Sequence, residues 1–271
     1  MGMAGVALAT LKFDVSVYEF ELMQNHAHLV LSGSGMQCMR VFSFLKRRFS
    51  EQLIRNGYPP LPANYGCKLK PIDNEDALRT QILYAVRNPY EKNYCSPGGY
   101  KWGASYLFYN ELAAQIRGEK VSSLSKAAVR AATGSDESLP PDWEIHPELG
   151  VLPRCFVNVA QVERLFGSPK EYHTRLVKEY EVMIKTAMEL GEDVELTVSE
   201  LRDIANTELR NAFPGRLFKT ITPEEKCRVA VKLHERLGLT AAQLAQALYI
   251  SELTVSQVIR SKDYGVRPTF H

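Results

Sequence analysis

The sequence predicts a mixed α+β protein in which strands come early and helices fill the second half. Apolar residues alternate with polar ones over residues 13–23, with one slip, and a second short strand pattern follows at residues 26–31. Residues 159–190 and 222–261 instead show apolar residues at helical spacing. Strands grouped in one part of a chain and helices in another are typical of the α+β class.

The composition is that of an ordinary soluble globular protein. The chain has 271 residues, enough for a core and for one or two domains, and it is 45% hydrophobic and 24% charged. Its formal net charge is only +2, so any signal for nucleic-acid binding has to be local.

Cysteine usage and the N-terminal residues favour a cytoplasmic protein that does not insert into a membrane. The five cysteines are widely spaced and form no Cys-x-x-Cys pair, which favours reduced thiols over disulfides or a zinc site. Residues 3–11 resemble the end of a helix. This apolar run lacks a basic leader and is too short to span a membrane.

Two histidines begin the second predicted strand, directly after a turn at Gln24-Asn25. His26 and His28 are two residues apart, so both imidazoles point to the same face of the strand. Such a pair can bind one divalent cation. The alternative is a pair of exposed histidines beside a turn.

Residues 36–54 predict a helix with an apolar face and a basic face. The basic face sets five cations against one acid, Glu51: Arg40, Lys46, Arg47, Arg48 and Arg55. Such a charge run is often only a solvated helix face. In a chain that is nearly neutral overall, we favour a surface that contacts DNA phosphates, because lysine and arginine supply the sequence-independent part of DNA affinity.

A loop rich in proline and glycine covers residues 57–73. It includes a predicted short strand at Lys68–Lys70. Tyr58 and Tyr65 in this loop either pack against the protein or offer platforms on which bases stack, and the sequence does not separate these roles.

Residues 77–89 predict an amphipathic helix with two more candidate residues. Tyr84 and Asn88 lie one turn apart, so they share a face. Asn88 can offer its amide oxygen as a third metal ligand, and Tyr84 can offer a phenolate beside the metal. Alternatively, Tyr84 packs on Trp102 and Asn88 caps the helix. Pro89 is expected to end or kink this helix.

The predicted domain organisation has three parts. Residues 1–110 carry the strands, the histidines and the tyrosine helix. Residues 111–150 begin helical and pass into a connector rich in Ser, Ala, Gly and Pro, which is the expected domain boundary. Residues 151–271 form a helical region.

The C-terminal segment predicts three helices, each preceded by a hydroxyl residue that can cap it. The caps are Thr222 for residues 223–237, Thr240 for residues 241–248 and Ser251 for residues 252–261. Pro223 suits the first helical position, and Gly238 terminates the first of these helices.

The last two helices and their tight turn resemble a helix-turn-helix, of the kind at the C-terminus of the replication initiator DnaA and in Trp repressor. Tyr249 stands at the turn position that glycine often holds, where a tyrosine must avoid positive φ or bear strain. Thr254, Gln257 and Arg260 are candidate contacts to duplex DNA. The alternative is a helical hairpin with a structural role only.

Three segments, taken together, resemble the single-tyrosine HUH transposases. Met-Gln-Asn-His-Ala-His at residues 23–28 resembles their M-P-N-H-x-H motif, with Gln24 in place of proline. Tyr-Ala-Val-Arg-Asn-Pro at residues 84–89 resembles the Y-x-x-x-N-P segment of the REP-associated, insertion-sequence-200-like branch. Residues 100–106 look like that branch's W-S-S-Y segment, with Gly-Ala-Ser replacing Ser-Ser. The match covers roughly residues 10–110.

The resemblance implies a ferredoxin-like core of antiparallel strands and a nickase that rejoins single-stranded or hairpin DNA. Mg²⁺ or Mn²⁺, held by His26, His28 and Asn88, would polarise the scissile phosphodiester. Tyr84 would attack it and form a reversible 5′-phosphotyrosine link. The C-terminal module would add contacts to duplex DNA. The sequence does not fix the oligomeric state, and a homodimer is one option.

One departure from the family supports an alternative function. The family has another strand and most of a helix before the segment equivalent to Phe13, whereas about a dozen residues precede Phe13 here. That strand is internal in a ferredoxin-like sheet, and its loss would expose backbone groups beside the histidines. Either the true start codon lies upstream, or the chain is a decayed or domesticated derivative. In the second case it would be a non-catalytic helix-turn-helix DNA-binding protein.

Overall fold

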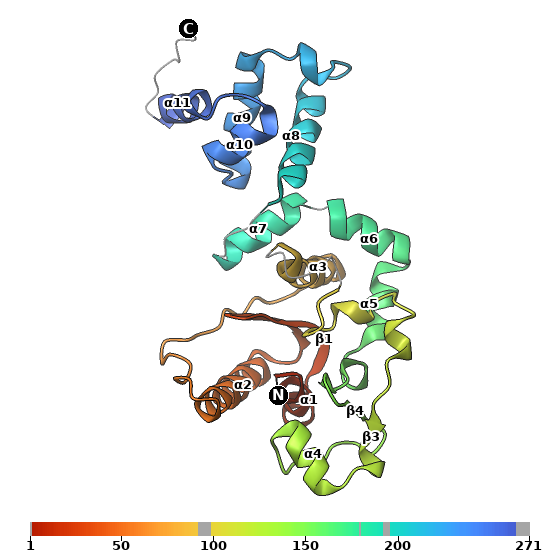
Figure 1. The fold of residues 1–271 in the computed structure, drawn as a ribbon. Coiled ribbons are helices and arrows are strands. Elements are labelled where there is room, and N and C mark those ends of the chain that lie inside the picture. Colours follow the sequence, from red (N-terminus) through yellow and green to blue (C-terminus); the bar gives the residue numbers. More distant parts are fainter. Residues whose placement is uncertain (1, 92–98, 179, 192–195, 264–271) are drawn as a thin grey trace. The chain divides into compact units, whose positions relative to one another are not determined.

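The computed structural model describes residues 2–91, 99–178, 180–191 and 196–263. The chain divides into two compact units, residues 1–178 and residues 179–271, which are described in turn (Figure 1). The mixed α+β class is confirmed, since small antiparallel sheets occur beside many helices. Within the described ranges, no helix combines the length and apolarity needed to cross a bilayer.

The first unit is built on a pair of antiparallel strands, β1 (Ser16–Leu22) and β2 (Ala27–Ser32), as the sequence predicts. In their register Glu21 lies opposite His28, so these two side chains share a face of the sheet. The other edge of β1 carries an isolated antiparallel bridge between Glu21 and Gly103. There the Leu22 N–H donates to Trp102 O at 3.0 Å. Residues 102–104 therefore flank β1 on the side away from β2.

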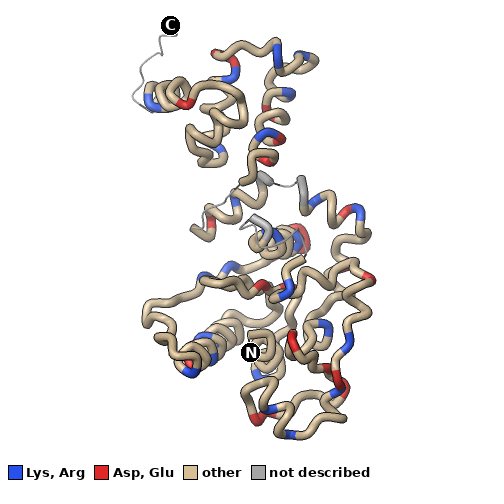
Figure 2. The backbone as a smooth tube through the Cα atoms, in the orientation of Figure 1, with Lys and Arg blue, Asp and Glu red and all other residues tan. Residues whose placement is uncertain are grey.

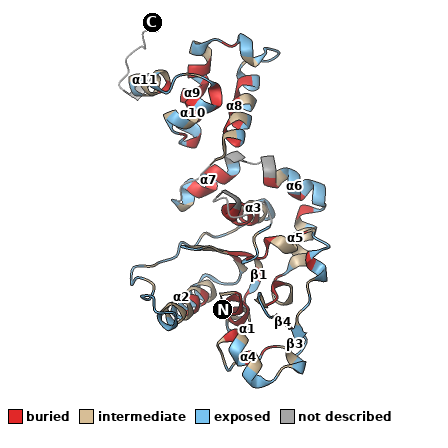
Figure 3. Ribbon diagram, viewed as in Figure 1, coloured by how far each residue is buried: buried red, intermediate tan, exposed pale blue. Residues whose placement is uncertain are grey.

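Three helices cover this strand pair: α1 (Gly2–Phe13), α2 (Gly35–Arg55) and α3 (Glu75–Glu91). Figure 1 shows α1 and α2 on one side of β1 and α3 on the other. Gly5 lets α1 approach α2 closely, because a Cβ at this position would lie 3.1 Å from Leu45 Cδ2. Much of α1 and of α3 is buried (Figure 3).

One local expectation in this unit is wrong, and a second is wrong in part. The strand predicted at Lys68–Lys70 is a loop, because no neighbouring strand of the described chain pairs with it. Pro89 does not end its helix, since α3 continues to Glu91. A proline this close to a helix end removes one backbone hydrogen bond.

The segment predicted as a connector, residues 111–150, is folded. It contributes α4 (Lys126–Thr133) and a small sheet of order β3-β4-β5, made of Glu119–Lys120, Glu144–His146 and Gly150–Val151. Short 3₁₀ helices lie at Ser105–Leu107, Ala113–Gln115, Val121–Ser123 and Pro153–Cys155. The unit continues through α5 (Val159–Phe166) and α6 (Pro169–Lys178), so the division between the two units falls at residue 178 rather than within 111–150.

The second unit is helical, as predicted. Its helices are α7 (Tyr180–Leu190), α8 (Val198–Ala212), α9 (Pro223–Leu237), α10 (Ala241–Leu248) and α11 (Glu252–Asp263), with a 3₁₀ turn at Phe218–Thr220. The predicted caps Thr222 and Thr240 both form capping boxes. A shared apolar core joins α8 to α11, and Leu233, Leu244 and Val255 in it are fully buried. This core accounts for the packing of four short helices into one body.

The turn between α10 and α11 is strained, as its sequence indicates. Tyr249 has a φ of 54°, in the left-handed region that a bulky side chain rarely adopts. Its ring lies 4.9 Å from the guanidinium carbon of Arg202 and 5.9 Å from the ring of Phe218. A cation–π contact stabilises by about 0.5–1 kcal/mol at an exposed site, which offsets part of the backbone strain.

Candidate active site

The four predicted catalytic and metal-binding residues lie together in the first unit. His26 directly precedes β2 and His28 lies within it, while Tyr84 and Asn88 lie one turn apart on α3. His26 Nε2 is 3.0 Å from Asn88 Oδ1, although 62 residues separate the two in sequence. The rings of His26 and His28 are 5.0 Å apart between centroids, and His28 and Tyr84 are 5.3 Å apart. The fold thus brings the two motifs into contact.

Both ring nitrogens of His26 face an amide oxygen, so these contacts do not fix its tautomer. Its Nδ1 lies 2.7 Å from Asn25 Oδ1, an acceptor. If Nδ1 carries the proton, the lone pair of Nε2 points toward Asn88 Oδ1, and two acceptors face each other. Two ligand atoms held about 2.1 Å from one ion and at right angles lie about 3.0 Å apart. The pair therefore has the spacing of two neighbouring ligands of a divalent cation.

The donor set fits a divalent metal with open positions. It offers imidazole nitrogens from His26 and His28 and an amide oxygen from Asn88. Among the described residues there is no cluster of three or more His, Cys, Asp or Glu side chains, and this set relies on an amide instead. Three protein ligands leave room for substrate oxygens, which is typical of catalytic rather than structural sites.

Tyr84 and Asn88 are more buried than a substrate-facing pair requires. Tyr84 is 4% exposed and Asn88 is 6% exposed, whereas His26 and His28 are half-buried. A phosphodiester can therefore reach the Tyr84 hydroxyl only after α3 or its covering residues shift. Lid or helix movements of this kind are common in enzymes that bind large substrates.

A cavity of about 680 Å³ borders His26. Trp102, Tyr65 and Asn25 are among the residues that line it. Trp102 is 38% exposed, and the Lys101 ammonium lies 4.8 Å from its ring centroid. An exposed aromatic ring beside a cation is a surface on which a base of single-stranded DNA can stack.

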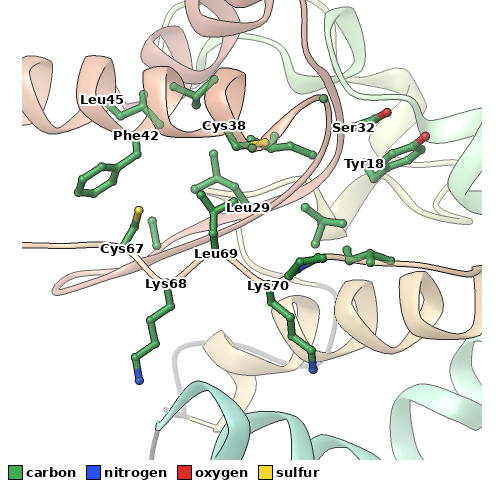
Figure 4. A pocket seen from close by; sticks show the side chains of 18 of the residues that line it. Tyr18, Leu29, Ser32, Cys38, Phe42, Leu45, Cys67, Lys68, Leu69 and Lys70 are labelled. Carbon is green, nitrogen blue, oxygen red and sulfur yellow. The ribbon is translucent and has the colours of Figure 1, made fainter.

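A second cavity of about 580 Å³ lies between β2, α2 and residues 65–72 (Figure 4). It is lined by Ala27, Leu29 and Leu31, which alternate with the histidines and so face the opposite side of the strand. Figure 4 shows Lys68 and Lys70 extending away from Leu29 and Phe42. Its lining combines apolar side chains with Lys46, Lys68 and Lys70, and it does not include the candidate catalytic residues.

The cations predicted to form a basic face on α2, whose positions are blue in Figure 2, do not share one environment. Arg40 and Arg47 are exposed. Lys46 instead donates to Ala63 O at 2.9 Å and to Tyr65 O at 2.6 Å, which fastens the 57–73 loop. Arg48 donates to Thr133 O at the end of α4, and burial lowers its pKa. Three of the five cations of the predicted face therefore have intramolecular partners, since Arg47 Nε also lies 3.8 Å from Glu51 Oε1.

We expect the Arg40→Gln/Arg47→Gln variant to bind hairpin DNA more weakly without loss of stability. Each lost phosphate contact should reduce the slope of log K against log salt by roughly 0.7–0.9. The measurement is hairpin affinity over a range of salt concentrations, with the exposed Lys126→Gln of α4 as a matched control. An unchanged slope in the double variant would exclude this surface from DNA binding.

The residues predicted for duplex contact lie on one side of α11. Thr254, Gln257 and Arg260 follow at three-residue spacing, and Gln257 and Arg260 are exposed while Thr254 is half-buried. Val255, on the opposite side of the helix, is fully buried in the core of the second unit. Gln257 and Arg260 are therefore exposed to a binding partner. Their helical spacing in the sequence predicts that they share this side of the helix.

The buried acids of β1 are the polar feature that the sequence pattern does not single out. Glu19 and Glu21 are both fully buried, and Glu21 lies opposite His28. The alternation of the strand places them on its polar face, which also carries the histidines, so no local signal in the sequence marks them as buried.

Gly103 makes room for one of these acids. A Cβ on Gly103 would lie 1.8 Å from Glu21 Oε2 and 2.6 Å from Phe20 O. We therefore expect Gly103→Ala to destabilise the fold by about 1–3 kcal/mol or more, as overpacked sites do. Chemical denaturation measures this, with Gly66→Ala as the control because its Cβ would meet only one atom, at 3.8 Å. Equal stability of the two variants would show that the Glu21 carboxyl does not occupy this position.

The three motif segments are neighbours in space as well as ordered in sequence. Residues 23–28 lead into β2, α3 packs on the strand pair, and residues 102–104 flank β1. The Tyr100 hydroxyl donates to Leu22 O at 2.9 Å and ties the third segment to the first. Scans against protein-family models, curated proteins and solved structures found no match to this chain.

Proposed function

We propose that this protein is a metal-dependent nickase and strand transferase, a transposase, that acts on single-stranded or hairpin DNA in the cytoplasm. The observation that carries the proposal is the meeting of His26 Nε2 and Asn88 Oδ1 at 3.0 Å, beside the contact of His28 with Tyr84. A nucleophile, two imidazoles and an amide oxygen from two separate motifs form one group. If the two histidines were only a surface pair, and Asn88 only a helix cap, His26 and Asn88 would not need to be in contact.

The chemistry of this group is phosphoryl transfer. When bound, Mg²⁺ or Mn²⁺ would neutralise charge on the scissile phosphate. The Tyr84 oxygen forms a bond to phosphorus, the bond to the 3′ oxygen breaks, and the tyrosine proton passes to solvent. The product is a 5′-phosphotyrosine and a free 3′-hydroxyl. Because a phenol with a pKa near 10 is a good leaving group, a new 3′-hydroxyl can displace Tyr84 and rejoin the strand.

Several features support assigning further roles to other parts of the chain. The placement of α1 and α2 on one face of β1 and α3 on the other supports a core derived from the ferredoxin-like fold. The α10–turn–α11 pair, with its exposed Gln257 and Arg260, supports a helix-turn-helix that enters a duplex groove. A homodimer is an assembly in which two such modules would read two half-sites.

A second candidate function is a non-catalytic DNA-binding protein derived from such a transposase. The burial of Tyr84 favours it, and so does the pairing of only two strands in the main sheet of the described chain. In this case the C-terminal module binds DNA and the first unit has no nuclease activity. Covalent capture of DNA in the presence of Mn²⁺ separates the two functions.

We expect deletion of residues 179–271, which removes the second compact unit, to abolish duplex binding and to leave hairpin binding and nicking partly intact. The physical reason is that the candidate catalytic residues all lie in the first unit. Gel-shift and nicking assays measure both activities. The full-length Gln257→Ala/Arg260→Ala variant should show the same selective loss of duplex binding. If the deletion removes all DNA binding and the full chain nicks no DNA with any metal, the enzyme proposal fails.

A further inference from the structure

Four buried side chains beside β1 carry oxygen atoms with no hydrogen-bond partner among the described residues. They are the carboxylates of Glu19 and Glu21, the hydroxyl of Ser105 and the hydroxyl of Tyr172. Glu19 and Glu21 are 0% exposed, Ser105 is 2% exposed and Tyr172 is 1% exposed. Buried polar atoms are almost always paired, so six such atoms in one region require an explanation.

These side chains come from three segments and face one another. Glu19 and Glu21 are two residues apart on β1 and therefore share a face. The Glu21 carboxyl lies against Gly103, at the position that a Cβ there would fill. Burial raises the pKa of Glu21 to about 8, and the neighbouring Ser105 hydroxyl acts in the opposite direction. Burial also raises the pKa of Tyr172 on α6, and the nearby Glu19 and Glu21 raise it further.

The charge of this group is not balanced by a basic side chain of the described chain. Neither carboxylate has a basic partner among the described residues, and the side chains that act on the pKa of Glu21 are those of Ser105 and Glu19. The buried guanidinium of Arg87 on α3 donates to Leu176 O at 2.8 Å instead. Two ionised carboxylates without a counter-charge are strongly disfavoured in a protein interior. Either a proton shared by the two carboxyls or a bound cation must therefore neutralise them.

We propose that Glu19, Glu21 and Ser105 form a second cation site, which takes one hard divalent ion such as Mg²⁺, Mn²⁺ or Ca²⁺. The donors are all oxygens, as these ions prefer, and two carboxylates supply the matching double negative charge. The Tyr172 hydroxyl borders the site. This site differs in its residues from the His26, His28 and Asn88 set and does not depend on Tyr84 chemistry. Its ion would hold β1 against residues 103–105 and so stabilise the strand that pairs with His28.

The test measures ion binding rather than nicking, so it stands apart from the proposed function. In the His26→Ala/His28→Ala variant, equilibrium dialysis with Mn²⁺ and detection by electron paramagnetic resonance should show one bound ion per chain. Adding Glu19→Gln/Glu21→Gln should remove this ion. Adding Glu111→Gln/Glu119→Gln, which alters two exposed glutamates, should leave it bound.

A second variant keeps the proposal testable if the glutamine pair does not fold. Ser105→Ala retains both charges but loses a neutral ligand, so it should weaken Mn²⁺ binding several-fold in the histidine-free background. The melting temperature of that background should also rise with added Mn²⁺. Absence of bound Mn²⁺ there would mean that Glu19 and Glu21 share a proton instead, and retention of Mn²⁺ in the glutamine variant would place the ion elsewhere. Either result overturns the proposal.

Discussion

Replacing Tyr84 with phenylalanine is expected to abolish covalent attachment of the protein to a labelled hairpin DNA in the presence of Mn²⁺. The variant lacks only the attacking oxygen, and its ring can keep the edge contact with His28. Loss of a nucleophile that acts with other catalytic groups typically costs about 10⁴-fold or more in rate. Hairpin binding should stay close to wild type, because the variant leaves the proposed phosphate contacts on α2 unchanged. Denaturing gels of the labelled adduct and gel-shift assays of the same samples measure both quantities.

Tyr106→Phe is the matched control for this experiment. Tyr106 is the last residue of the third motif, and burial raises its pKa to about 12, but it is not among the side chains grouped around His26 and Asn88. The Tyr106 variant should therefore form the adduct as the wild type does. An adduct of normal yield in Tyr84→Phe would mean that another residue is the nucleophile.

The second large effect is expected at the histidines. His26→Ala or His28→Ala should remove metal-dependent cleavage, and EDTA should have the same effect on the wild type. His26 Nε2 lies 3.0 Å from Asn88 Oδ1, the proposed amide ligand. The His26→Ala variant therefore lacks one of two neighbouring metal ligands. Cleavage rates at several Mn²⁺ concentrations measure the effect.

The control for the histidine variants is His173→Ala, which changes an exposed histidine on α6. It should cleave at the wild-type rate. Full-rate cleavage by the wild type in EDTA would exclude a role for metal in the reaction. A zinc ion retained through purification at His26 and His28 would instead indicate a structural site.

Local signals in the sequence predicted local structure well. The alternation before His26 identified β1, and the hydroxyl residues Thr222 and Thr240 marked the starts of α9 and α10, where both form capping boxes. These features depend on contacts within a few residues, so a sequence pattern contains them. For Tyr249 the sequence left two alternatives, avoidance of positive φ or strain, and the φ of 54° shows that the turn before α11 bears the strain.

Features set by contacts distant in sequence could not be predicted in the same way. The loop at Lys68–Lys70 has a strand-like composition, but strand formation needs a partner that the pattern does not reveal. Lys46 and Arg48 resemble their exposed neighbours in sequence, yet each is held by a backbone carbonyl from another segment. The candidate site was found because its motifs each keep their residues at a fixed local spacing.

The burial of the two acids of β1 is another feature that the sequence could not predict. Glu19 and Glu21 occupy positions that a half-exposed strand would leave to solvent, and nothing local indicates that residues 103–105 and α6 cover them. Only the assembled structure shows that two charges are buried next to the histidine strand. Their explanation therefore rests on the tertiary packing.

The central claim is that Tyr84 becomes bonded to the 5′ phosphate of cleaved DNA. The most direct measurement is mass spectrometry of peptides from the wild-type protein after reaction with a hairpin substrate and Mn²⁺, followed by nuclease trimming. The account predicts one modified peptide, which contains Tyr84 and carries a nucleotide phosphate on its phenolic oxygen. A nucleotide attached to any other residue, or cleaved DNA without any modified peptide, would contradict it.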